Sequence, residues 1–584
     1  MIRLQVRFAT LAALALAFFA PTASAATIYV DVNLTTGANN GSSWADAYRT
    51  VDGVAVALAA SVAGDEIWVA QGTYKPTTTL TRTIYFTLKT GVAVYGGFVG
   101  TETMLVQRNF ALNVTTLSGD LLGDDGSNLF NDNSFHVINA NSATATAILD
   151  GFVVTGGNAN SSANQDRGGG ILMLANSNAT VRNCTFRANR CTFGGGAGYI
   201  NSSSPTFTDC RFENNVGGSF GGAFDQASGV GTVFTRCVFT GNTAARAGAI
   251  EIFSSSPVKV YDCIFYNNSC TGSGGGGAIF VSGSSPSFRN TLVYGNTSTV
   301  SSAAGFIASG STVDVANCIV YGNTGPGGAQ GAVNQLSGST YIVSYSCVQG
   351  GFGGTGNISA DPGIVNPVGG DFHSQPTSPC IDAGSNALIP PALTVDFDLR
   401  PRLADEPSIP NSPAGFVDMG PFEYPVPSIT RYCFGDGFLI QCPCGNNSSF
   451  LVEEGCLSSI GVGGALSASG NARYSNDTVI LSGTQMTNGP CLYFQGTTKA
   501  GSGIGVQFGD GLLCVSGSII RLGVVFNTGG ASQFPNGGPS LSAAGFVTGA
   551  GAERTYQVWF RDAAAFCSAA TNNLTSAVSI VWEQ

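Results

Sequence analysis

Asn183-Cys-Thr-Phe-Arg-Ala-Asn189 returns as Asp209-Cys-Arg-Phe-Glu-Asn-Asn215, and the same pattern recurs along the middle of the chain. Its second position advances in steps of 26, 27, 26, 28, 27 and 29 residues through Cys184, Cys210, Cys237, Cys263, Thr291, Cys318 and Cys347. Gly-Gly-Ala or Ala-Gly-Ala motifs fall between most of the copies. A period in the upper twenties, with short apolar pieces and Gly or Asn turns, predicts a solenoid of β-coils, since the leucine lattice of a leucine-rich repeat is missing.

The repeated side chains indicate how the coils stack. In a parallel β-helix neighbouring coils lie about 4.8 Å apart, so that one repeat position forms a ladder. Cys and Phe, two residues apart, point to the same side, which we take as the interior. We therefore expect the ladder cysteines to be small buried hydrophobes with free thiols, although their spacing also permits disulfides. The final asparagine of each copy is expected to bond to its counterpart on the next coil.

The pairing of F-x-x-N with G-G-A-[ILV] resembles the repeats of chlamydial polymorphic outer-membrane proteins and related bacterial β-helix proteins. The resemblance covers about residues 140–350. It implies an all-β chain built on a right-handed parallel β-helix and an outward-facing location at the cell surface. Two further cysteines, Cys191 and Cys270, each lie seven residues beyond a ladder cysteine and are not assigned.

Composition and charge agree with a stacked β architecture. The chain has 81 Gly among 584 residues, and 10% of its residues are charged, against about 25% in an average soluble domain. Long surface helices need charged faces, so a sheet-rich and turn-rich fold is favoured. The net charge is -11 and no run of Lys or Arg occurs, which argues against a nucleic-acid partner.

The first residues have the features of an export signal. Arg3 and Arg7 precede an apolar run at 8–20, which is followed by Ala23-Ser-Ala25. A charged segment, an apolar segment and an A-x-A site predict a signal peptide that is removed, and hence a secreted or cell-surface protein. No later segment of the sequence is long and apolar enough to span a bilayer.

The segments on either side of the repeats differ from them in composition. The N-terminal one resembles the cap of secreted β-helix proteins, and the one that follows the repeats resembles the closing segment of exported proteins with variable C-terminal anchors. The predicted organisation is a signal peptide at 1–25, a cap at 26–75, a β-helix at 76–350, a closing segment at 351–424, a linker at 425–430 and a cysteine-containing module at 431–584.

The last module has short strands divided by Gly-rich turns, which predicts a β-sandwich of about 150 residues. Its Tyr432-Cys-Phe-Gly-Asp436 and Phe508-Gly-Asp510 motifs resemble a C-terminal module of secreted planctomycete proteins. The resemblance implies that Cys491, which is foreign to the family pattern, is free. It implies that the other cysteines form disulfides, in any of 15 connectivities: Cys433, Cys442, Cys444, Cys456, Cys514 and Cys567. A zinc site at Cys442-Pro-Cys444 is less favoured, because zinc ligands are usually spaced C-x₂₋₄-C.

One outward column of the coils carries the only catalytic candidates. Aligning the Gly-Gly-Ala motifs places Tyr199, Asp225, Glu251 and Phe280 at one position on successive coils. Neighbouring carboxylates then approach the separation of about 5–5.5 Å found in retaining glycosidases, with Tyr199 and Phe280 positioned to stack on sugar. The alternative interpretation is a solvated face on which two carboxylates are adjacent by chance. His136 and His373 have no partner motif nearby.

Two other surface features stand out. Tyr266, Tyr294 and Tyr321 form a second aromatic column suited to glycan stacking, beside an outward position that turns apolar on the same coils. A strand that is apolar on both faces indicates a cover, either the closing segment or the C-terminal module, or otherwise a glycan or protein partner.

The remaining candidate is an acidic loop. Asp120, Asp124 and Asp125 offer oxygen ligands to calcium, although the loop lacks EF-hand spacing and a solvated loop is the alternative. No other cofactor is expected.

The function favoured by these features is that of an exported, non-catalytic β-helix protein with a structural, adhesive or glycan-binding role. Its expected partners are extracellular polysaccharide or cell-surface components. The alternative is a polysaccharide-degrading enzyme, either a pectate-lyase-like lyase or a glycoside hydrolase, because a β-helix face suits an extended sugar; the fold alone does not decide between them. In a third interpretation, the C-terminal module attaches the protein and the β-helix is a passive stalk.

Overall fold

A computed structural model describes residues 25–582, apart from 163, 230, 255–256, 273, 301–303, 327, 330–332, 336–338, 407–408, 425–428, 450–451, 475, 548–551, 565 and 567. The predicted signal peptide lies outside the described residues except for Ala25. The chain divides into two compact units, Met1–Tyr424 and Pro425–Gln584. In the part that the structure describes, no helix is long and apolar enough to cross a membrane.

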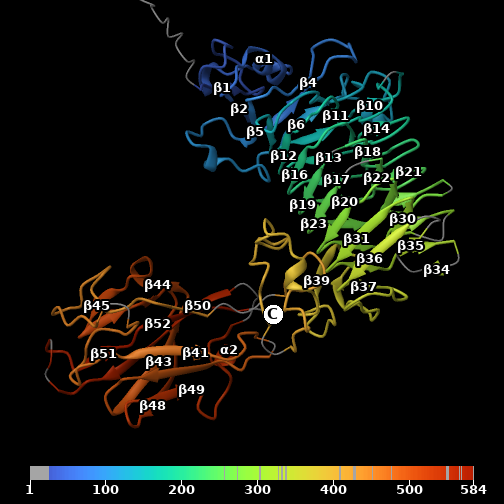
Figure 1. Ribbon diagram of the computed structural model, residues 1–584. Coiled ribbons are helices and arrows are strands. Elements are labelled where there is room, and N and C mark those ends of the chain that lie inside the picture. Colours follow the sequence, from blue (N-terminus) through green and yellow to red (C-terminus); the bar gives the residue numbers. More distant parts are fainter. Residues whose placement is uncertain are drawn as a thin grey trace, which may run out of the picture. The chain divides into compact units, whose positions relative to one another are not determined.

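The first unit is a parallel β-helix whose coils contribute one strand to each of three sheets (Figure 1). Sheet A contains β1 (Thr27–Val30), β2 (Glu66–Ala70), β5 (Ala93–Phe98), β8 (Ile148–Asp150), β12 (Thr180–Arg182), β16 (Thr206–Thr208), β19 (Val233–Thr235), β23 (Lys259–Tyr261), β27 (Ser287–Arg289), β31 (Thr312–Ala316) and β36 (Thr340–Ser344). Sheet B contains β3 (Gly72–Tyr74), β6 (Thr115–Ser118), β9 (Val153–Thr155), β13 (Thr185–Arg187), β17 (Arg211–Glu213), β20 (Val238–Thr240), β24 (Ile264–Tyr266), β28 (Leu292–Tyr294), β32 (Ile319–Tyr321) and β37 (Cys347–Val348). Sheet C contains β4 (Phe86–Thr87), β7 (Ile138–Asn139), β11 (Ile171–Met173), β15 (Gly198–Asn201), β18 (Phe224–Ala227), β22 (Ile250–Phe253), β26 (Ile279–Ser282), β30 (Phe306–Ser309) and β35 (Val333–Gln335).

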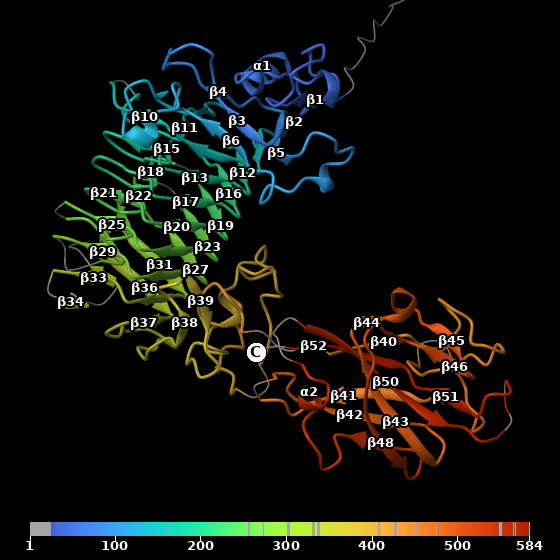
Figure 2. The same ribbon diagram turned by 180° about the vertical axis from the view of Figure 1, so that it is seen from behind.

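Shorter elements complete the coils. Two-residue strands connect sheets B and C: β10 (Asn158–Ala159), β14 (Arg190–Cys191), β21 (Thr243–Ala244), β25 (Ser269–Cys270), β29 (Thr297–Ser298), β33 (Thr324–Gly325) and β34 (Gly328–Ala329). The 3-10 turns of the first unit are η1 (Trp44–Asp46), η2 (Leu105–Gln107), η3 (Asp125–Ser127) and η4 (Asn386–Leu388). Figure 2 shows the succession of coils from behind. The predicted parallel β-helix is confirmed.

The N-terminal end of the solenoid is closed by helix α1 (Gly53–Ala60), which contacts β1, β2 and β4. Val54, Ala57 and Leu58 of this helix are buried in the same core as Val30 and Phe86. The helix therefore covers apolar side chains that would otherwise end the stack in water.

A ladder of asparagine side chains links neighbouring coils through the interior. Its buried members are Asn189, Asn215, Asn242, Asn268, Asn296 and Asn323. Asn242, for example, donates from Nδ2 to the carbonyl oxygen of Phe212 on the preceding coil at 2.8 Å and to Oδ1 of Asn268 at 2.9 Å. Its own Oδ1 accepts from the backbone nitrogen and Nδ2 of Asn215, both at 3.0 Å. Each amide thus satisfies polar groups on the coils before and after it.

The ladder cysteines lie at the corner between sheets A and B. The prediction for Cys347 is wrong, because Ser346 takes the last ladder position and Cys347 lies opposite Ile319 on the outward face. Cys184, Cys210, Cys237, Cys263 and Cys318 are buried and free. Burial raises the pKa of the Cys184 thiol to about 12. Cys191 and Cys270, which the repeat pattern left unassigned, are also buried and free. The prediction of free, packed thiols on the coils agrees with this arrangement.

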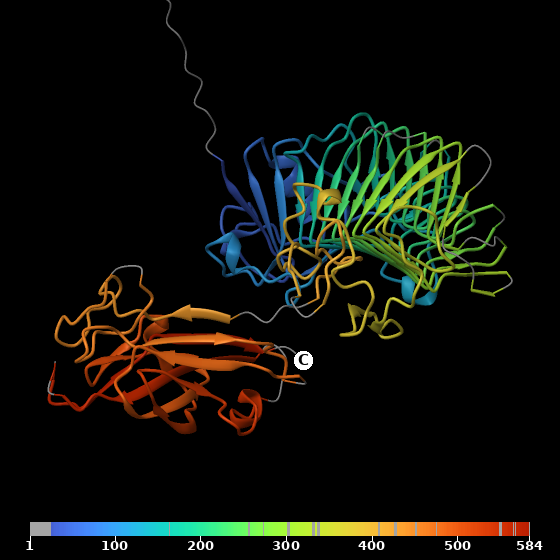
Figure 3. The same cartoon turned by 60° about the horizontal axis from the view of Figure 1, so that its bottom comes forward.

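The closing segment covers the outer face of sheet B. It contains the antiparallel pair β38 (Ile364–Asn366) and β39 (Asp371–Ser374), packs on sheet B, and runs in front of the coils in the view of Figure 3. One apolar cluster joins the sheet to the segment: Val238, Ile264, Leu292, Ile319 and Cys347 from the coils, and Ile364, Phe372, Cys380, Met419 and Phe422 from the segment. The cover expected over this apolar face is therefore supplied by the chain itself.

A fully buried arginine ties the closing segment to the coils. Arg402 forms ion pairs with Asp262 of the β-helix at 3.2 Å and with Glu423 at 3.0 Å. It also donates to the carbonyl oxygens of Gly420 at 2.7 Å and Pro421 at 2.9 Å. All three ionic side chains are at most 1% exposed, so the guanidinium compensates carboxylates that water does not reach.

The second unit is a β-sandwich, as predicted. Its larger sheet contains β40 (Ile429–Tyr432), β52 (Ala577–Trp582), β50 (Ala552–Arg561), β43 (Gly489–Gly496), β48 (Ile520–Asn527) and β51 (Asn572–Leu574). The facing sheet contains β41 (Ala465–Ser469), β42 (Ile480–Thr484) and β49 (Ser532–Phe534). The remaining elements are the pair β44 (Thr498–Lys499) and β47 (Val515–Ser516), the pair β45 (Val506–Phe508) and β46 (Gly511–Leu513), the turn η5 (Ala500–Gly503) and helix α2 (Leu541–Ala544).

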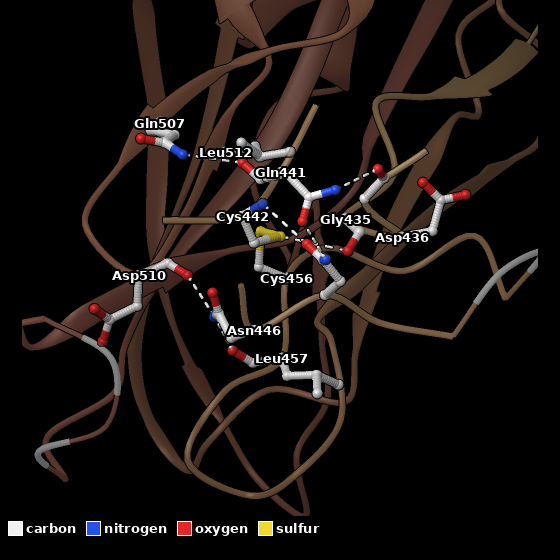
Figure 4. Close-up of a disulfide and its surroundings, with 12 residues drawn as sticks. Gly435, Asp436, Gln441, Cys442, Asn446, Cys456, Leu457, Gln507, Asp510 and Leu512 are labelled. Carbon is white, nitrogen blue, oxygen red and sulfur yellow. Dashed lines mark hydrogen bonds between the residues drawn. A yellow bond between two sulfur atoms is a disulfide. The ribbon is translucent and has the colours of Figure 1, made fainter. Parts of the chain in front are cut away.

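Disulfides hold the first loops of the sandwich. Cys433 is bonded to Cys514 and Cys442 to Cys456. Figure 4 shows the second bridge, beside which Asn446 donates to the carbonyl oxygens of Leu457 and Asp510 at 2.7 and 2.9 Å. Cys444 is also disulfide-bonded and Cys491 is free, whereas Cys567 lies outside the described residues.

Replacing one rung of the ladder tests its contribution. We expect Asn242→Ala to lower the free energy of unfolding by about 1–3 kcal/mol, because it removes the side-chain partner of the buried backbone groups Phe212 C=O and Asn215 N–H on the preceding coil. Thr240→Ala, at the outward end of β20 on the same coil, should change it by less than about 0.5 kcal/mol. Chemical denaturation measures both, and equal effects of the two substitutions would contradict this account.

Removing the buried cation tests the attachment of the closing segment. We expect Arg402→Leu to destabilise the protein by about 3–5 kcal/mol, since Asp262 and Glu423 stay buried without a partner. Hydrogen exchange should then increase at β20, β24 and β28, which the segment covers. Unchanged protection of these strands would show that Arg402 does not hold the cover.

Candidate functional site

The predicted carboxylate column exists in the structure. Strand register sets Tyr199 opposite Asp225, Asp225 opposite Glu251, and Glu251 opposite Phe280, on β15, β18, β22 and β26. However, Tyr199, Asp225, Glu251 and Phe280 are only 2%, 5%, 2% and 6% exposed. The expectation of an open face on which Tyr199 and Phe280 stack on sugar is therefore corrected, since all these side chains are covered.

The cover is a second stack of side chains from the turns that precede sheet C. Arg167 lies 4.1 Å from the ring centre of Phe193, and Phe193 packs edge-on against Phe220 at 4.8 Å. Arg246 lies 4.4 Å from the ring centre of Phe220 and 4.5 Å from that of Phe280. Backbone bridges between these turns repeat at each coil, so the stack follows the column along the solenoid.

The carboxylates beneath this cover interact with its arginines. Arg246 donates from Nε to Glu251 at 3.0 Å and also pairs with it through Nη2. Arg167 donates from Nη1 to the hydroxyl of Tyr199 at 2.9 Å. Burial, reinforced by the neighbouring charge of Glu251, raises the pKa of Asp225 to about 7. Burial likewise raises the pKa of Glu251, against the effect of Arg246. Glu251 thus anchors the turn that carries Arg246, and neither carboxylate has an open surface on which a sugar ring would sit.

The tyrosine column is also used inside the protein. Tyr266, Tyr294 and Tyr321 are in register on β24, β28 and β32. Phe372 of the closing segment packs against Tyr266 and Tyr294, with ring centres 4.9 and 6.0 Å apart. Tyr294 also lines a cavity of about 250 Å³ with Ile364 and other residues of that segment. The tyrosine rings therefore pack against the closing segment, and Tyr294 also borders the cavity at the edge of that segment.

The acidic loop gathers the three predicted carboxylates. Oxygen atoms of Asp120, Asp124 and Asp125 lie within 4.8 Å of one another. Asp120 already accepts backbone N–H groups of Asp124 and Asp125, both at 3.2 Å, and Asn133 donates to Asp125 at 2.9 Å. Burial and the neighbouring carboxylates raise the pKa of Asp125. Calcium takes six to eight oxygen ligands, and these three side chains supply only some of them. The calcium site therefore stays a prediction.

A groove that the repeat pattern did not reveal lies on the first coils. It encloses about 310 Å³ between the loop that carries Phe110 and the corner of sheets A and B. Its wall combines apolar side chains such as Val114, Phe152 and Val153 with five polar ones, which are Thr115, Asn183, Thr185, Asp209 and Arg211. Phe110 is 41% exposed, and the side chains of Asp209 and Arg211 are 36% and 49% exposed. Arg236 holds Asp209 in place with contacts of 2.7 and 2.9 Å.

The signals for this groove were of two kinds. Asn183 and Asp209 precede ladder cysteines, and Thr185 and Arg211 follow them at an outward position, so their exposure is predictable from the repeat. Phe110 belongs to a non-repeating loop, and its approach to the coils had no sequence signal. The groove places an aromatic ring beside charged, amide and hydroxyl groups along one edge of the stacked strands. Such a combination of groups suits a polyhydroxylated ligand.

Comparison with known proteins agrees with the fold. A family model described as a right-handed β-helix region matches residues 121–292 and 169–348. The crystal structure of pectate lyase Pel9A aligns at 14% identity and a TM-score of 0.35, over 69% of this chain and 97% of that one. The enzymatically active domain of tailspike protein 2 from bacteriophage CBA120 aligns at 11% identity and a TM-score of 0.22, over 91% and 73%. No curated protein matches the sequence.

The pKa of Asp225 predicts a pH-dependent stability. Below about pH 4 the carboxyl is protonated in both the folded and unfolded states, and between about pH 4 and 7 only the unfolded state ionises, so stability falls. We expect Asp225→Asn to remove this loss, with a gain over the unsubstituted protein that grows from about pH 4 to 7, reaches a few kcal/mol and then levels off.

Urea denaturation between pH 4 and 8 measures the effect. Glu213→Gln, on β17 of the same coil, is the control and should leave the pH profile unchanged. A constant difference between Asp225→Asn and the unsubstituted protein at every pH would contradict the assignment.

Proposed function

We propose that this is an exported cell-surface or secreted protein whose β-helix binds extended polysaccharide without cleaving it. The groove between Phe110 and the first coils carries this proposal. Its polar groups lie on successive coils, Thr185 on β13 opposite Arg211 on β17, so they follow the strand spacing of about 4.8 Å. A linear sugar chain running along the solenoid would meet them in succession, with Phe110 at its side.

The chemistry of the groove supports a glycan ligand with acidic or hydroxyl groups. Arg211 is half exposed, and its contact with Glu213 is long, at 3.7 Å, which leaves hydrogen-bond donors for a carboxylate or a ring hydroxyl. Asp209 is held by Arg236 and offers acceptors to sugar hydroxyls. Phe110 supplies an apolar surface against which the less polar face of a sugar ring packs.

The burial of the two carboxylates speaks against their acting as a hydrolytic pair. Asp225 and Glu251 are adjacent in register, as a catalytic pair would be. A substrate does not reach them, because Arg246 and the Phe193–Phe220 stack lie over them. The polysaccharide-degrading alternative would need a different set of residues on the coils. The proposed export and surface location follow from the residues at 1–25 and from the resemblance of the repeats.

A polysaccharide panel scored for both binding and product release tests the proposal. We expect retention of at least one acidic or neutral polysaccharide without release of oligosaccharides. Arg211→Ala and Phe110→Ala should each weaken this binding about tenfold, the loss expected for one charged hydrogen bond or one packed aromatic ring. The control Arg187→Ala removes an exposed arginine from the preceding coil outside the groove and should leave binding unchanged.

Two results would contradict the proposal. Release of unsaturated or reducing oligosaccharides would establish the enzymatic alternative, and Asp225→Asn and Glu251→Gln would then show whether the covered pair is involved. Equal binding by the unsubstituted protein and both groove variants would show that the glycan does not bind in this groove.

A further inference from the structure

The C-terminal sandwich contains a larger and chemically different cavity. It measures about 630 Å³, within the range of about 300–1,000 Å³ that is usual for small-molecule sites. Its lining is mostly apolar or aromatic: Leu492, Phe494, Phe508, Leu513, Val515, Ile519, Trp559 and Leu574. Ser516, Gly517 and Arg521 complete it.

The cavity lies on the face of the larger sheet that points away from the sandwich core. Along β43, Cys491 and Tyr493 belong to the core, whereas the alternate residues Leu492 and Phe494 line the cavity. Strand β50 behaves in the same way, since Val558 is in the core and Trp559 is in the cavity. The period of two along a strand therefore gives this sheet two apolar faces, one packed and one hollowed.

The wall of the cavity comes from the smaller strand pairs. Phe508 and Leu513, on β45 and β46, and Val515 on β47 stand beside the sheet. Phe494, Val515 and Leu574 form a buried cluster at its base, with Leu513 and Trp559 packed against them. Phe508 and Ile519 are 49% and 50% exposed at its margin. The floor is thus built by packed strands, and apolar side chains remain in water at the opening.

The scarcity of polar groups decides which ligand class fits. A sugar in this cavity would bury hydroxyls that have few partners beyond Ser516 and Arg521, at a cost of about 1–3 kcal/mol for each one unpaired. An aliphatic or aromatic body has no such penalty and gains from leaving water. The Phe110 groove also exposes mostly apolar surface, but it differs from this cavity in having Asn183, Asp209 and Arg211 along its wall.

Arg521 places one positive charge at the cavity. It lies on β48, the edge strand of the sheet, and in the part of the chain that the structure describes it forms no ion pair or side-chain hydrogen bond. By contrast, Lys499 pairs with Glu553 at 2.7 Å and Arg431 pairs with Glu453 at 2.7 Å in the same module. An unpaired guanidinium beside an apolar cavity favours a ligand with a carboxylate, which it can hold in a bidentate pair.

We propose that the C-terminal module binds a single-chain anionic amphiphile of the fatty-acid class. The hydrocarbon chain lies over Phe494, Trp559 and Leu574, and the carboxylate pairs with Arg521. This site is separate from the proposed glycan groove and belongs to the other structural unit.

Calorimetric titration of the full-length protein tests the site, with hexadecanoate and hexadecanol each kept below its aggregation limit. We expect both to bind, hexadecanoate more tightly. Arg521→Ala should weaken hexadecanoate about tenfold and leave hexadecanol unchanged, since only the carboxylate pairs with the guanidinium. Ile519→Asp, at the exposed margin, should weaken both by introducing a charge beside the chain, with unchanged thermal unfolding showing that the module stays folded.

The matched control is Arg561→Ala, which removes an exposed arginine of the same sheet outside the cavity and should change neither titration. Failure of the unsubstituted protein to bind hexadecanoate would overturn the proposal. So would equal weakening of both ligands by Arg521→Ala, or binding to anionic lipid vesicles with none to the free fatty acid. Undiminished binding by Ile519→Asp would place the ligand at another site and would also overturn it.

Discussion

The stacking of one coil on the next through hydrogen bonds is the constraint on which the rest of the β-helix depends. Backbone bonds alone would allow neighbouring coils to slip, because parallel strands offer equally spaced partners. The buried asparagine amides restrict this freedom, since each must meet a carbonyl on one coil and an amide oxygen on the other. A slip by one residue would move these side chains out of the interior and leave several buried groups unpaired. The varying length of the steps, 26 to 28 residues, is absorbed in the turns and leaves the ladder in register as far as Ser346, the residue before Cys347.

The ends and faces of the solenoid follow from the same constraint. A stack of parallel strands has two open ends, and its outer faces are exposed unless something covers them. Helix α1 closes the first end, and the closing segment covers the apolar face of sheet B, where Arg402 enters the interior to meet Asp262. The turns before sheet C cover a third surface with their own stack of Phe and Arg side chains. The corner near Phe110 retains an open groove in which charged and amide side chains stand beside apolar ones, which is why the glycan proposal is placed there.

The ladders were predictable from the sequence, because in a solenoid residues one repeat apart lie next to each other on neighbouring coils. The alignment of Asp225 with Glu251, the free cysteines of the coils and the need for a cover over Val238 and Ile264 all follow from that arrangement. Burial of the carboxylates was not predictable, since it depends on how far the turns with Phe220 and Arg246 fold back over the sheet. The Phe110 loop and the cavity around Trp559 have no repeat, so their neighbours are set by long-range packing that residue spacing does not encode.

The buried thiols of the coils have a consequence for which cysteines can pair. The same chain carries cysteines that form disulfides in the sandwich and cysteines that stay reduced within the β-helix. In an oxidising compartment nothing in the unfolded chain separates the two groups, because thiolates react according to exposure and pKa. Closure of the coils provides the separation by removing their thiols from solvent. Pairing of a coil cysteine with a sandwich cysteine therefore requires the coils to open, so the ladder that holds the coils in register also keeps the two groups of cysteines apart.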